Sequence, residues 1–272
     1  MFLFLRTFAK MNIPILRIES LTTGYCSHRQ RHIVANQLTA SLAAGSFTAL
    51  IGTNGAGKST LLRTVAGLQP MLEGKVFWLG KSLSDYSRRE LSRTLAVVLT
   101  EKTMGEGLTV SEVVEMGRMP YTGFDGRLSA QDVQMVEEAM QLTGIAHFAH
   151  RKLTSLSDGE RQRVMIAKAL AQHTPVILLD EPTAFLDFPS KVALLRLLRK
   201  LAVQHGKTII VSTHDLELTF QIAEQLWLLS SEGLIEGTPR HLADKGILEQ
   251  FFHAEGLTFD RKQLRFTLDK SF

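Results

Sequence analysis

The sequence contains a single cysteine, Cys26, among its 272 residues. An intrachain disulfide is therefore impossible, and we expect a reducing compartment. No apolar run approaches the roughly 20 residues that a membrane-spanning helix needs. The apolar opening of residues 1–5 is too short for the core of a signal peptide. We expect residues 1–12 to be an N-terminal extension, with Met11 as an alternative start.

A dense run of lysine or arginine is also absent, and the formal net charge is only +4. The sequence thus lacks the basic patch typical of nucleic-acid binding, and we expect no nucleic-acid partner. It has no internal repeat, low-complexity linker or sustained heptad pattern. Hydrophobic residues make up 44% and charged residues 21%, proportions that exclude a disordered chain and predict a substantial core.

Apolar runs of strand length alternate with helical patterns along most of the chain. We predict strands at 15–18, 33–42, 47–51, 74–80, 95–99, 176–179, 208–211 and 226–229. We predict helices at 59–66, 110–116, 132–142, 191–203 and 216–223, with short helices and weak strands after Thr238. The alternation predicts an α/β fold with a mainly parallel sheet. We expect one large domain at 13–240, a helical insert at about 100–158, and a tail at 241–272 that packs on the domain.

The segment Gly52–Ser59 matches the phosphate-binding pattern G-x-x-x-x-G-K-[ST]. It follows a predicted strand and opens a predicted helix, an order that argues against a chance glycine-rich turn. Glycines let backbone N–H groups surround phosphate oxygens, Lys58 can reach the β- and γ-phosphates, and Ser59 can bind Mg²⁺. The candidate nucleotide-binding residues of this segment are Gly52, Asn54, Gly55, Gly57, Lys58, Ser59 and Thr60.

Two carboxylates end the apolar strand predicted at 176–179. The strand carries Asp180 to the carboxyl edge of the sheet, where the phosphate-binding loop is also expected. Asp180 can hold Mg²⁺, directly or through water, and Glu181 can polarise an attacking water. The alternative interpretation is a strand that ends in two surface acids. The phosphate-binding loop upstream argues against this alternative.

The segment Leu156–Arg163 predicts the start of a helix that runs to about Ala171, with Ser157 as its N-cap. The segment resembles the signature sequence of ATP-binding cassette (ABC) ATPases, usually written LSGGQ. Asp158 stands in place of the first paired glycine and Glu160 in place of the glutamine, whereas Ser157 and Gly159 are kept.

Other segments follow in the order of that family. Tyr25 resembles the aromatic residue that stacks on adenine; simple packing is the alternative. The segment Ala184–Asp187 resembles the loop that crosses the dimer interface, with Asp187 as the matched residue. His214 resembles the switch histidine that senses the γ-phosphate, where a satisfied loop histidine is the alternative.

The resemblance covers nearly all of residues 15–240. It implies a P-loop ATPase fold with an antiparallel N-terminal β part and an inserted helical subdomain. It implies ATP and Mg²⁺ as ligands and a head-to-tail dimer that encloses two ATP molecules. Each ATP is then expected to contact the phosphate-binding loop of one copy and Ser157 and Gly159 of the other. The implied catalytic residues are Glu181, His214 and Lys58.

The sequence departs from the family at the end of the strand predicted at 95–99. The family has a glutamine there that contacts Mg²⁺ or the attacking water, whereas this sequence has Thr100 followed by Glu101. We expect Thr100 to be the positional equivalent, acting on the metal through a water, and keep Glu101 as the alternative metal contact.

The segments Gly107–Val114 and Gly117–Tyr121 resemble the helical region of importer ATPases for iron–siderophore, haem and cobalamin uptake. This implies polytopic membrane permease subunits as partners and, indirectly, an extracytoplasmic substrate-binding protein. The expected location is peripheral, on the cytoplasmic face of the inner membrane. The alternatives are a soluble ABC ATPase that is not coupled to transport and the ATPase of an exporter.

Overall fold

The computed structural model describes residues 14–27, 30–99, 107–123, 125–254 and 256–268. The strands are β1 (Leu16–Ser27), β2 (Gln30–Leu42), β3 (Phe47–Gly52), β4 (Glu73–Trp78), β5 (Lys81–Ser82), β6 (Leu95–Val98), β7 (Val176–Asp180), β8 (Thr208–Ser212), β9 (Gln225–Ser230), β10 (Gly233–Gly237), β11 (Leu257–Asp260) and β12 (Arg265–Leu268). The α-helices are α2 (Lys58–Val65), α3 (Arg88–Thr94), α4 (Val110–Glu115), α5 (Ala130–Thr143), α6 (Asp158–Ala171), α7 (Phe188–His205), α8 (Leu216–Ile222), α9 (Pro239–Asp244) and α10 (Ile247–Phe251). The 3₁₀ turns are η1 (Leu83–Asp85), η2 (Met116–Arg118), η3 (Ala146–Phe148) and η4 (Leu153–Ser155).

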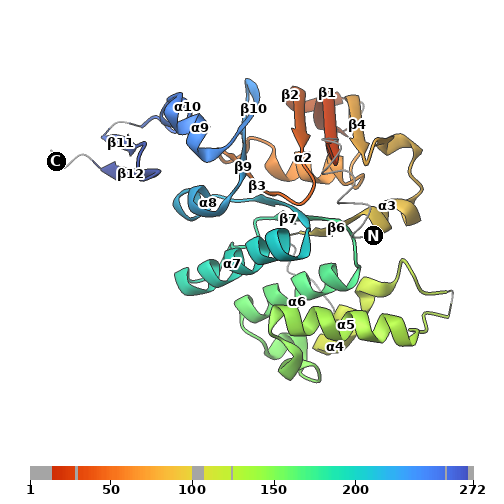
Figure 1. The fold of residues 1–272 in the computed structure, drawn as a ribbon. Helices are drawn as coiled ribbons and strands as arrows, with labels where there is room; N and C mark the ends of the chain where they lie inside the picture. The colour runs from red at the N-terminus through yellow and green to blue at the C-terminus, as the bar shows by residue number, and fades with distance from the viewer. Residues whose placement is uncertain (1–13, 28–29, 100–106, 124, 255, 269–272) are drawn as a thin grey trace.

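A six-stranded sheet in the order β10-β9-β3-β8-β7-β6 runs through the middle of the molecule (Figure 1). The pairs from β9 to β6 are parallel, and only β10 is antiparallel to its neighbour. Consecutive residues of a strand face opposite sides of the sheet. Accordingly Ile177 and Leu179 of β7 join one buried cluster, while Val176 and Leu178 join the other. The sheet is therefore buried on both faces, as a parallel sheet requires.

A second sheet, antiparallel and in the order β2-β1-β4-β5, lies at the top of Figure 1. It covers one face of the central sheet together with α2. The fully buried Trp78 anchors this layer, because its indole N–H donates to the carbonyl of Val65 at the end of α2, 2.7 Å away. The N-terminal antiparallel part implied by the resemblance is confirmed.

The helices α4, α5 and α6 form a block at the opposite end of the molecule (Figure 1). Gly117 allows η2 to approach α6 closely, since a Cβ there would lie 2.3 Å from the carbonyl oxygen of Lys168. Arg118 is 5% exposed, and it bonds both Asp132 near the start of α5 and the carbonyl of Ala171 at the end of α6. The motif Gly117–Tyr121 thus fastens the three helices to one another.

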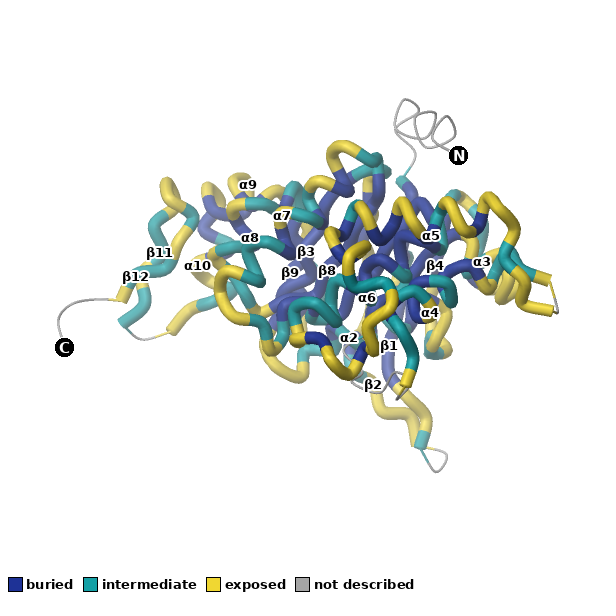
Figure 2. Tube along the Cα trace, turned by 90° about the horizontal axis from the view of Figure 1, so that it is seen from below, coloured by how far each residue is buried: buried dark blue, intermediate teal, exposed yellow. Residues whose placement is uncertain are grey.

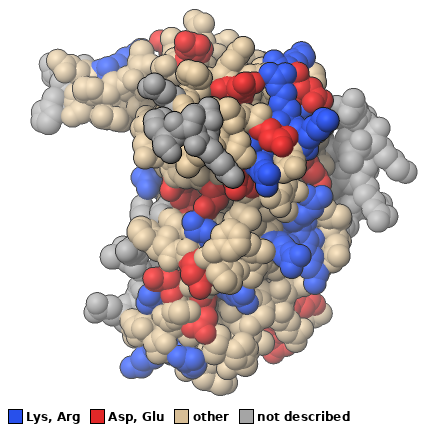
Figure 3. All heavy atoms as spheres, turned by 90° about the vertical axis from the view of Figure 1, so that its left-hand side faces the viewer, with Lys and Arg blue, Asp and Glu red and all other residues tan. Residues whose placement is uncertain are grey.

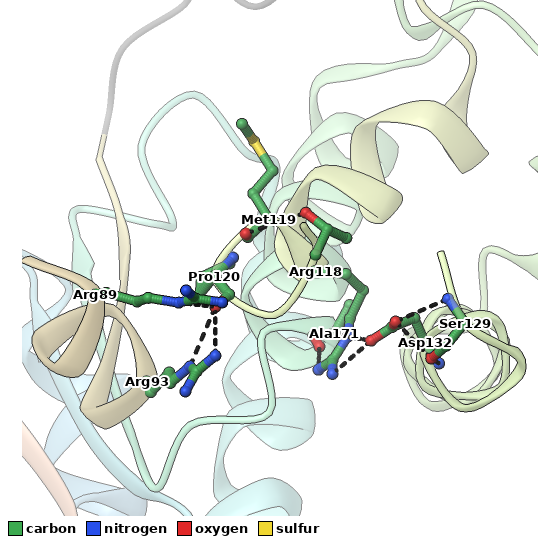
Figure 4. Close-up of polar contacts among 9 residues, drawn as sticks. Arg89, Arg93, Arg118, Met119, Pro120, Ser129, Asp132 and Ala171 are labelled. Carbon is green, nitrogen blue, oxygen red and sulfur yellow. Dashed lines mark hydrogen bonds and ion pairs between the residues drawn. The ribbon is translucent and has the colours of Figure 1, made fainter. Parts of the chain in front are cut away.

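The same motif also connects the helical block to α3 (Figure 4). Arg89 and Arg93 of α3 donate to the carbonyl oxygen of Pro120 at 2.9 to 3.1 Å. The guanidinium groups of Arg93 and Arg118 both lie over the ring of Tyr121. The position of this block relative to the central sheet is therefore held by polar contacts as well as by apolar burial.

The C-terminal segment packs beside α8. The short hairpin β11–β12 projects from the body and is mostly exposed or half-buried, in contrast to the buried central sheet (Figure 2). Its contact with the body is aromatic, because the rings of Phe252, Phe259 and Phe266 surround Phe220 of α8 at 6.1 to 6.3 Å between centroids. These rings join the described end of the chain to α8, and the predicted domain boundaries stay a prediction.

The predicted elements are confirmed with shifted boundaries. β1 extends to Ser27, whereas a strand was expected only at 15–18, and α7 begins at Phe188 instead of at residue 191. The stretch from 83 to 94, for which no element was predicted, forms η1 and α3. Its sequence is rich in serine and charge, and a capping box between Ser87 and Glu90 starts the helix without an apolar periodicity.

Candidate functional site

The glycines of the segment Gly52–Ser59 meet three different geometrical demands. Gly55 and Gly57 have φ values of +80° and +96°, in the left-handed region that favours glycine. A Cβ on Gly57 would in addition lie 2.5 Å from Cγ1 of Val34. Gly52 is needed for a different reason, because a Cβ there would lie 2.4 Å from the carbonyl oxygen of Leu229 on β9. The loop is thus shaped by the neighbouring strands β2 and β9.

The N-terminus of α2 is left without a side-chain cap. Its N-cap is Gly57, and no acidic residue stands in its first turn. The helices α3, α4, α5 and α6, by contrast, all begin with a capping box. An uncapped helix N-terminus that follows two left-handed glycines directs backbone N–H groups at an anion. The observed geometry fits a bound phosphate group.

Lys58 opens α2 and is 5% exposed. Its ammonium group donates to the carbonyl oxygens of Gly52 and Thr53 at 2.9 and 3.2 Å, so that it lies back across the loop. Burial lowers the pKa of Lys58, and the nearby carboxylates of Glu181 and Asp180 oppose part of this effect. The lysine is held where a negatively charged ligand in the loop would reach it.

Asp180 stands at the end of β7 and is 5% exposed. Its Oδ1 accepts hydrogen bonds from the hydroxyl of Ser59, at 2.9 Å, and from that of Ser212 at the end of β8, at 2.7 Å. Ser59 and Asp180, each predicted to hold Mg²⁺, are thus in direct contact. This contact joins the start of α2 to the carboxyl ends of two parallel strands.

Glu181 follows with a φ of +46°, an uncommon value for a residue with a side chain. Its backbone N–H donates to the hydroxyl of Ser212 at 2.8 Å, and its Oε1 lies 2.6 Å from Nε2 of His214. The side chains of Glu181 and His214 are 30% and 43% exposed, so both can meet a ligand from solvent. The structure therefore brings together Lys58, Ser59, Asp180, Glu181 and His214.

Three further candidates, Ser157, Gly159 and Asp187, lie at the starts of α6 and α7. Ser157 caps α6, and its hydroxyl donates to the carboxylate of Glu160 at 2.9 Å. Gly159 has ordinary space for a Cβ, with Ser190 as its nearest neighbour at 3.5 Å, so the packing of one chain does not require glycine there. Asp187 caps α7 and accepts from the N–H of Ser190. Hydrogen bonding to the Ser190 side chain, and next to its backbone N–H, lowers the pKa of the Asp187 carboxyl.

Ser157 and Gly159 share a hollow with the segment that follows Glu181. The hollow has a volume of about 300 Å³ and is lined from both sides, by Gly144, Ile145, His147, Phe148, Ser157, Gly159, Glu160, Arg163, Leu186, Ser190 and Leu194. The signature-like segment and the predicted interface segment are therefore neighbours on one side of the molecule. Phe185 and Phe188, on either side of Leu186 and Asp187, are 69% and 67% exposed.

Tyr25 lies on β1, beyond the strand predicted at 15–18. It is 54% exposed, and its ring stacks on that of His32 with 5.1 Å between centroids. An exposed, flat aromatic face is compatible with either role considered for this residue. Thr100 and its alternative Glu101 lie outside the described residues, so their roles stay predictions.

A divalent cation would find few protein ligands here. Within the described part of the chain, no three His, Cys, Asp or Glu side chains gather closely enough to hold a metal ion on their own. The hydroxyl of Ser59 and the carboxylate of Asp180 are adjacent oxygens beside the phosphate-shaped loop. That arrangement fits Mg²⁺, which prefers oxygen ligands and takes the rest from water and substrate phosphates.

Two residues that bond to the candidate site residues or to their neighbours were not foreseen from the sequence. Ser212 bonds both acidic residues, and Asp215 accepts from Thr183 and Lys191. The signal for Ser212 was its place two residues before His214 at a strand end. A polar residue at the end of a buried strand lies beside the last residue of the neighbouring parallel strand. Here that neighbouring residue is Asp180.

The face shown in Figure 3 carries both basic and acidic side chains. In the described ranges, none of the helices is both long and apolar enough to pass through a membrane.

Comparison with known proteins agrees with this geometry. Residues 35–184 match the family model described as ABC transporter. The chain is 37% identical over 250 residues to the ferric enterobactin transport ATP-binding protein of Escherichia coli strain K12, covering 92% of this chain and 91% of the relative. It is 39% identical over 238 residues to the achromobactin transport ATP-binding protein of Dickeya dadantii strain 3937, covering 87% of each.

The solved structures agree as well. A dimeric bacterial ABC transporter cassette superposes with a TM-score of 0.72 at 28% identity, covering 82% of this chain and 98% of that chain. The same cassette in a post-hydrolysis state bound to ADP and Pi matches equally well. The predicted P-loop fold and ATPase class are thereby confirmed, and the chain belongs to the ATP-binding proteins of the ABC transporter family.

Proposed function

We propose that the chain binds and hydrolyses ATP to energise the import of a metal chelate through separate membrane permease subunits. The catalytic part of this proposal is supported by a connected group of side chains beside the phosphate-shaped loop. Donor and acceptor atoms in this group lie 2.6 to 2.9 Å apart, and its members are Ser59, Asp180, Glu181, Ser212 and His214.

In this proposal the residues divide the work. The loop N–H groups and Lys58 bind the phosphates, and Gly52, Asn54, Gly55, Gly57 and Thr60 shape or line that loop. Glu181 accepts a hydrogen bond from the water that attacks the γ-phosphorus, and His214 holds Glu181 in place. Ser59 and Asp180 hold Mg²⁺, which supplies positive charge to the phosphate oxygens when bound. Tyr25 supplies an aromatic face for adenine.

We further propose that two copies form a head-to-tail dimer around two ATP molecules. Ser157, Gly159 and Asp187 of one copy face the loop of the other. The exposed Phe185 and Phe188 beside Asp187 support this, because apolar side chains left open to water are typical of a contact surface. Closure of the dimer by ATP and its opening after hydrolysis shift the population of the permease subunits between two states.

The chelate class rests on the relatives. Similar chains are named for transport of achromobactin and ferric enterobactin, for iron(3+)-hydroxamate import, and for cobalamin import. Those names argue against the soluble and exporter alternatives. The proposed location is the cytoplasmic face of the cell membrane, with an extracytoplasmic binding protein that delivers the chelate.

The catalytic proposal is tested with Glu181→Gln. The amide cannot accept a proton from water, whereas the phosphate and Mg²⁺ contacts remain, so we expect ATP binding with hydrolysis reduced at least about 100-fold. An ATP-dependent dimer is expected to accumulate in gel filtration. Hydrolysis at the wild-type rate would show that Glu181 is not the general base.

The transport proposal needs the assembled complex. Copurification with detergent-extracted permease subunits, followed by uptake assays with ferric siderophores, haem and cobalamin, identifies the chelate. Lys58→Ala serves as the inactive control. Losing a charged hydrogen-bond donor to the phosphates costs roughly 1.5–3 kcal/mol of ATP-binding free energy. Uptake that is unchanged in the Lys58 variant contradicts the proposal.

A further inference from the structure

Three separate segments of the chain meet at the carboxylate of Asp215. Its Oδ2 accepts from the hydroxyl of Thr183 at 2.6 Å, and its Oδ1 accepts from the ammonium of Lys191 at 2.8 Å. Its own backbone N–H donates to the hydroxyl of Thr213 at 3.0 Å. The contacts join the loop after β7, the first turn of α7 and the turn after β8.

Each of these segments carries a residue of the candidate site. Thr183 lies two residues after Glu181, and Asp215 follows His214 directly. Lys191 lies one helical turn after Asp187, to whose carbonyl oxygen its backbone N–H donates at 2.9 Å. Asp215 and Lys191 therefore connect the predicted interface segment with both members of the pair Glu181–His214.

The contacts of Asp215 are buried enough from solvent to fix the relative positions of the three segments. Thr183 is 2% exposed, and the side chains of Lys191 and Asp215 are 26% and 23% exposed. Hydrogen bonds between ionised groups are stronger than neutral ones, and partial burial reduces their screening by salt. Glu181 and Phe185, at φ values of +46° and +66°, hold conformations that side-chain-bearing residues rarely adopt. Such backbone persists only where its surroundings over-determine it.

We propose that Lys191 and Asp215 are positioning residues for ATP hydrolysis. By bonding Thr183 and the start of α7 at once, they hold Glu181 and His214 at the distance at which the attacking water is oriented. The inference rests on the proposed function, since it takes Glu181 and His214 as the residues that act on water.

The test is steady-state ATPase kinetics of the full chain with Mg²⁺. Lys191→Met removes the ammonium group and keeps an unbranched side chain as long as the aliphatic part of lysine. We expect kcat to fall about tenfold with KM for ATP changed by less than about twofold, because misplaced groups lose rate and not ground-state binding. Lys191→Arg, which keeps a charged donor, is expected to retain kcat within about twofold.

A charge exchange separates positioning from general stability. The double variant Lys191→Asp with Asp215→Lys restores an ion pair of reversed polarity, and we expect it to recover much of the kcat that either single change loses. Lys81→Met is the matched control, because Lys81 forms a lysine–carboxylate pair with Glu90 at 3.1 Å on β5 and α3, outside the site. Its kinetics are expected to match the wild type.

The outcomes distinguish this inference from the proposed function. If Glu181→Gln abolishes hydrolysis while Lys191→Met keeps the wild-type kcat, the inference is overturned and the proposed function stands. The inference is also overturned if Lys191→Arg loses as much kcat as Lys191→Met and the exchange recovers none. Wild-type hydrolysis in the Glu181 variant overturns the proposed function instead.

Discussion

Ser212 shows how one side chain can organise two others. Its hydroxyl donates to Oδ1 of Asp180 and accepts from the N–H of Glu181, while the residue itself is fully buried at the end of β8. A hydroxyl can donate one hydrogen bond and accept two, so both contacts are satisfied together. The orientations of the two acidic residues are therefore coupled through a strand that contains neither.

Replacing Ser212 with alanine removes both contacts. We expect kcat for ATP hydrolysis to fall about 10- to 100-fold, since a small displacement of the acidic residues misplaces water and metal. Loss of a buried hydrogen-bonding partner is expected to lower the free energy of unfolding by about 1 kcal/mol.

Enzyme kinetics and urea unfolding measure the two effects. Ser46→Ala is the control, because Ser46 is also buried but bonds the carbonyl of Ala43 before β3, at the opposite end of the sheet. Equal losses of kcat in both variants would show that the effect is one of packing alone.

Lys207 is a buried ammonium whose side chain donates to the carbonyl of Thr174. Burial lowers its pKa from 10.5 to about 8. The unfolded chain therefore binds more protons than the folded one between about pH 8 and 10.5, and the contribution of Lys207 to stability rises with pH over this window. Below about pH 8 the charged form is buried at a cost of about 3 kcal/mol.

Lys207→Met is accordingly expected to stabilise the protein at pH 7. The gain over the wild type should shrink as the pH rises from about 8 to 10.5, since the lysine of the wild type is then neutral. Urea unfolding of both proteins across this range measures the difference. A gain that does not change with pH would contradict the assigned pKa.

At the scale of elements, the helical block depends on the motif Gly117–Tyr121. Gly117 permits the close approach of η2 to α6, and Arg118 joins the start of α5 to the end of α6. A buried ion pair contributes little compared with an apolar substitute, but removing one partner leaves an uncompensated charge. The arrangement of these helices is therefore sensitive to Arg118.

Arg118→Met leaves the carboxylate of Asp132 buried without its cation. We expect the free energy of unfolding to fall by about 3 kcal/mol, the lower end for such pairs, because Ser129 still bonds the carboxylate. The control Arg127→Met disrupts an exposed pair with Asp125 and is expected to cost less than about 1 kcal/mol. Similar unfolding midpoints for the two variants would refute the role assigned to Arg118.

At the scale of the whole molecule, one chain brings together only part of the proposed ATP site. Ser157 and Gly159 belong to a different element from the phosphate-binding loop, and the hydroxyl of Ser157 is engaged by its own cap. A head-to-tail pair would complete each site with the signature-like segment of the other copy. Its two sites would then be related by a two-fold axis.

Mixing two inactive variants tests that arrangement. In a heterodimer of Lys58→Ala with Ser157→Arg, one site carries both changes and the other carries neither. We expect each variant alone to trap no nucleotide, whereas an equal mixture traps about a quarter of the wild-type amount, as statistical pairing predicts. Tagged copies show whether heterodimers form. Heterodimers that trap nothing would exclude sites shared between two copies.

Much of this molecule could be inferred from local sequence. The phosphate-binding loop, the strand that ends in Asp180 and the helix capped by Ser157 are each determined by residues close together in the chain. Their signals are therefore visible without a structure: glycine spacing, an apolar run before carboxylates, and a cap before a helical pattern.

Other features were decided by the tertiary structure. Ser212 orients the residues after β7 because β8 lies beside it, Gly52 is required because β9 passes within contact of it, and Asp215 joins loops that are distant in sequence. Helix α3 was not predicted because its sequence has no apolar stripe. A capping box and the neighbouring elements stabilise it instead.

The sequence by itself determined the family and the class of chemistry, and it predicted which residues contact phosphate, metal and water. The tertiary structure decided how those residues are held, since the bonds of Lys191, Ser212 and Asp215 depend on which strand ends become neighbours. The order of the strands in the sheet follows from parallel pairing between segments that are far apart in the chain. No local sequence pattern encodes this order.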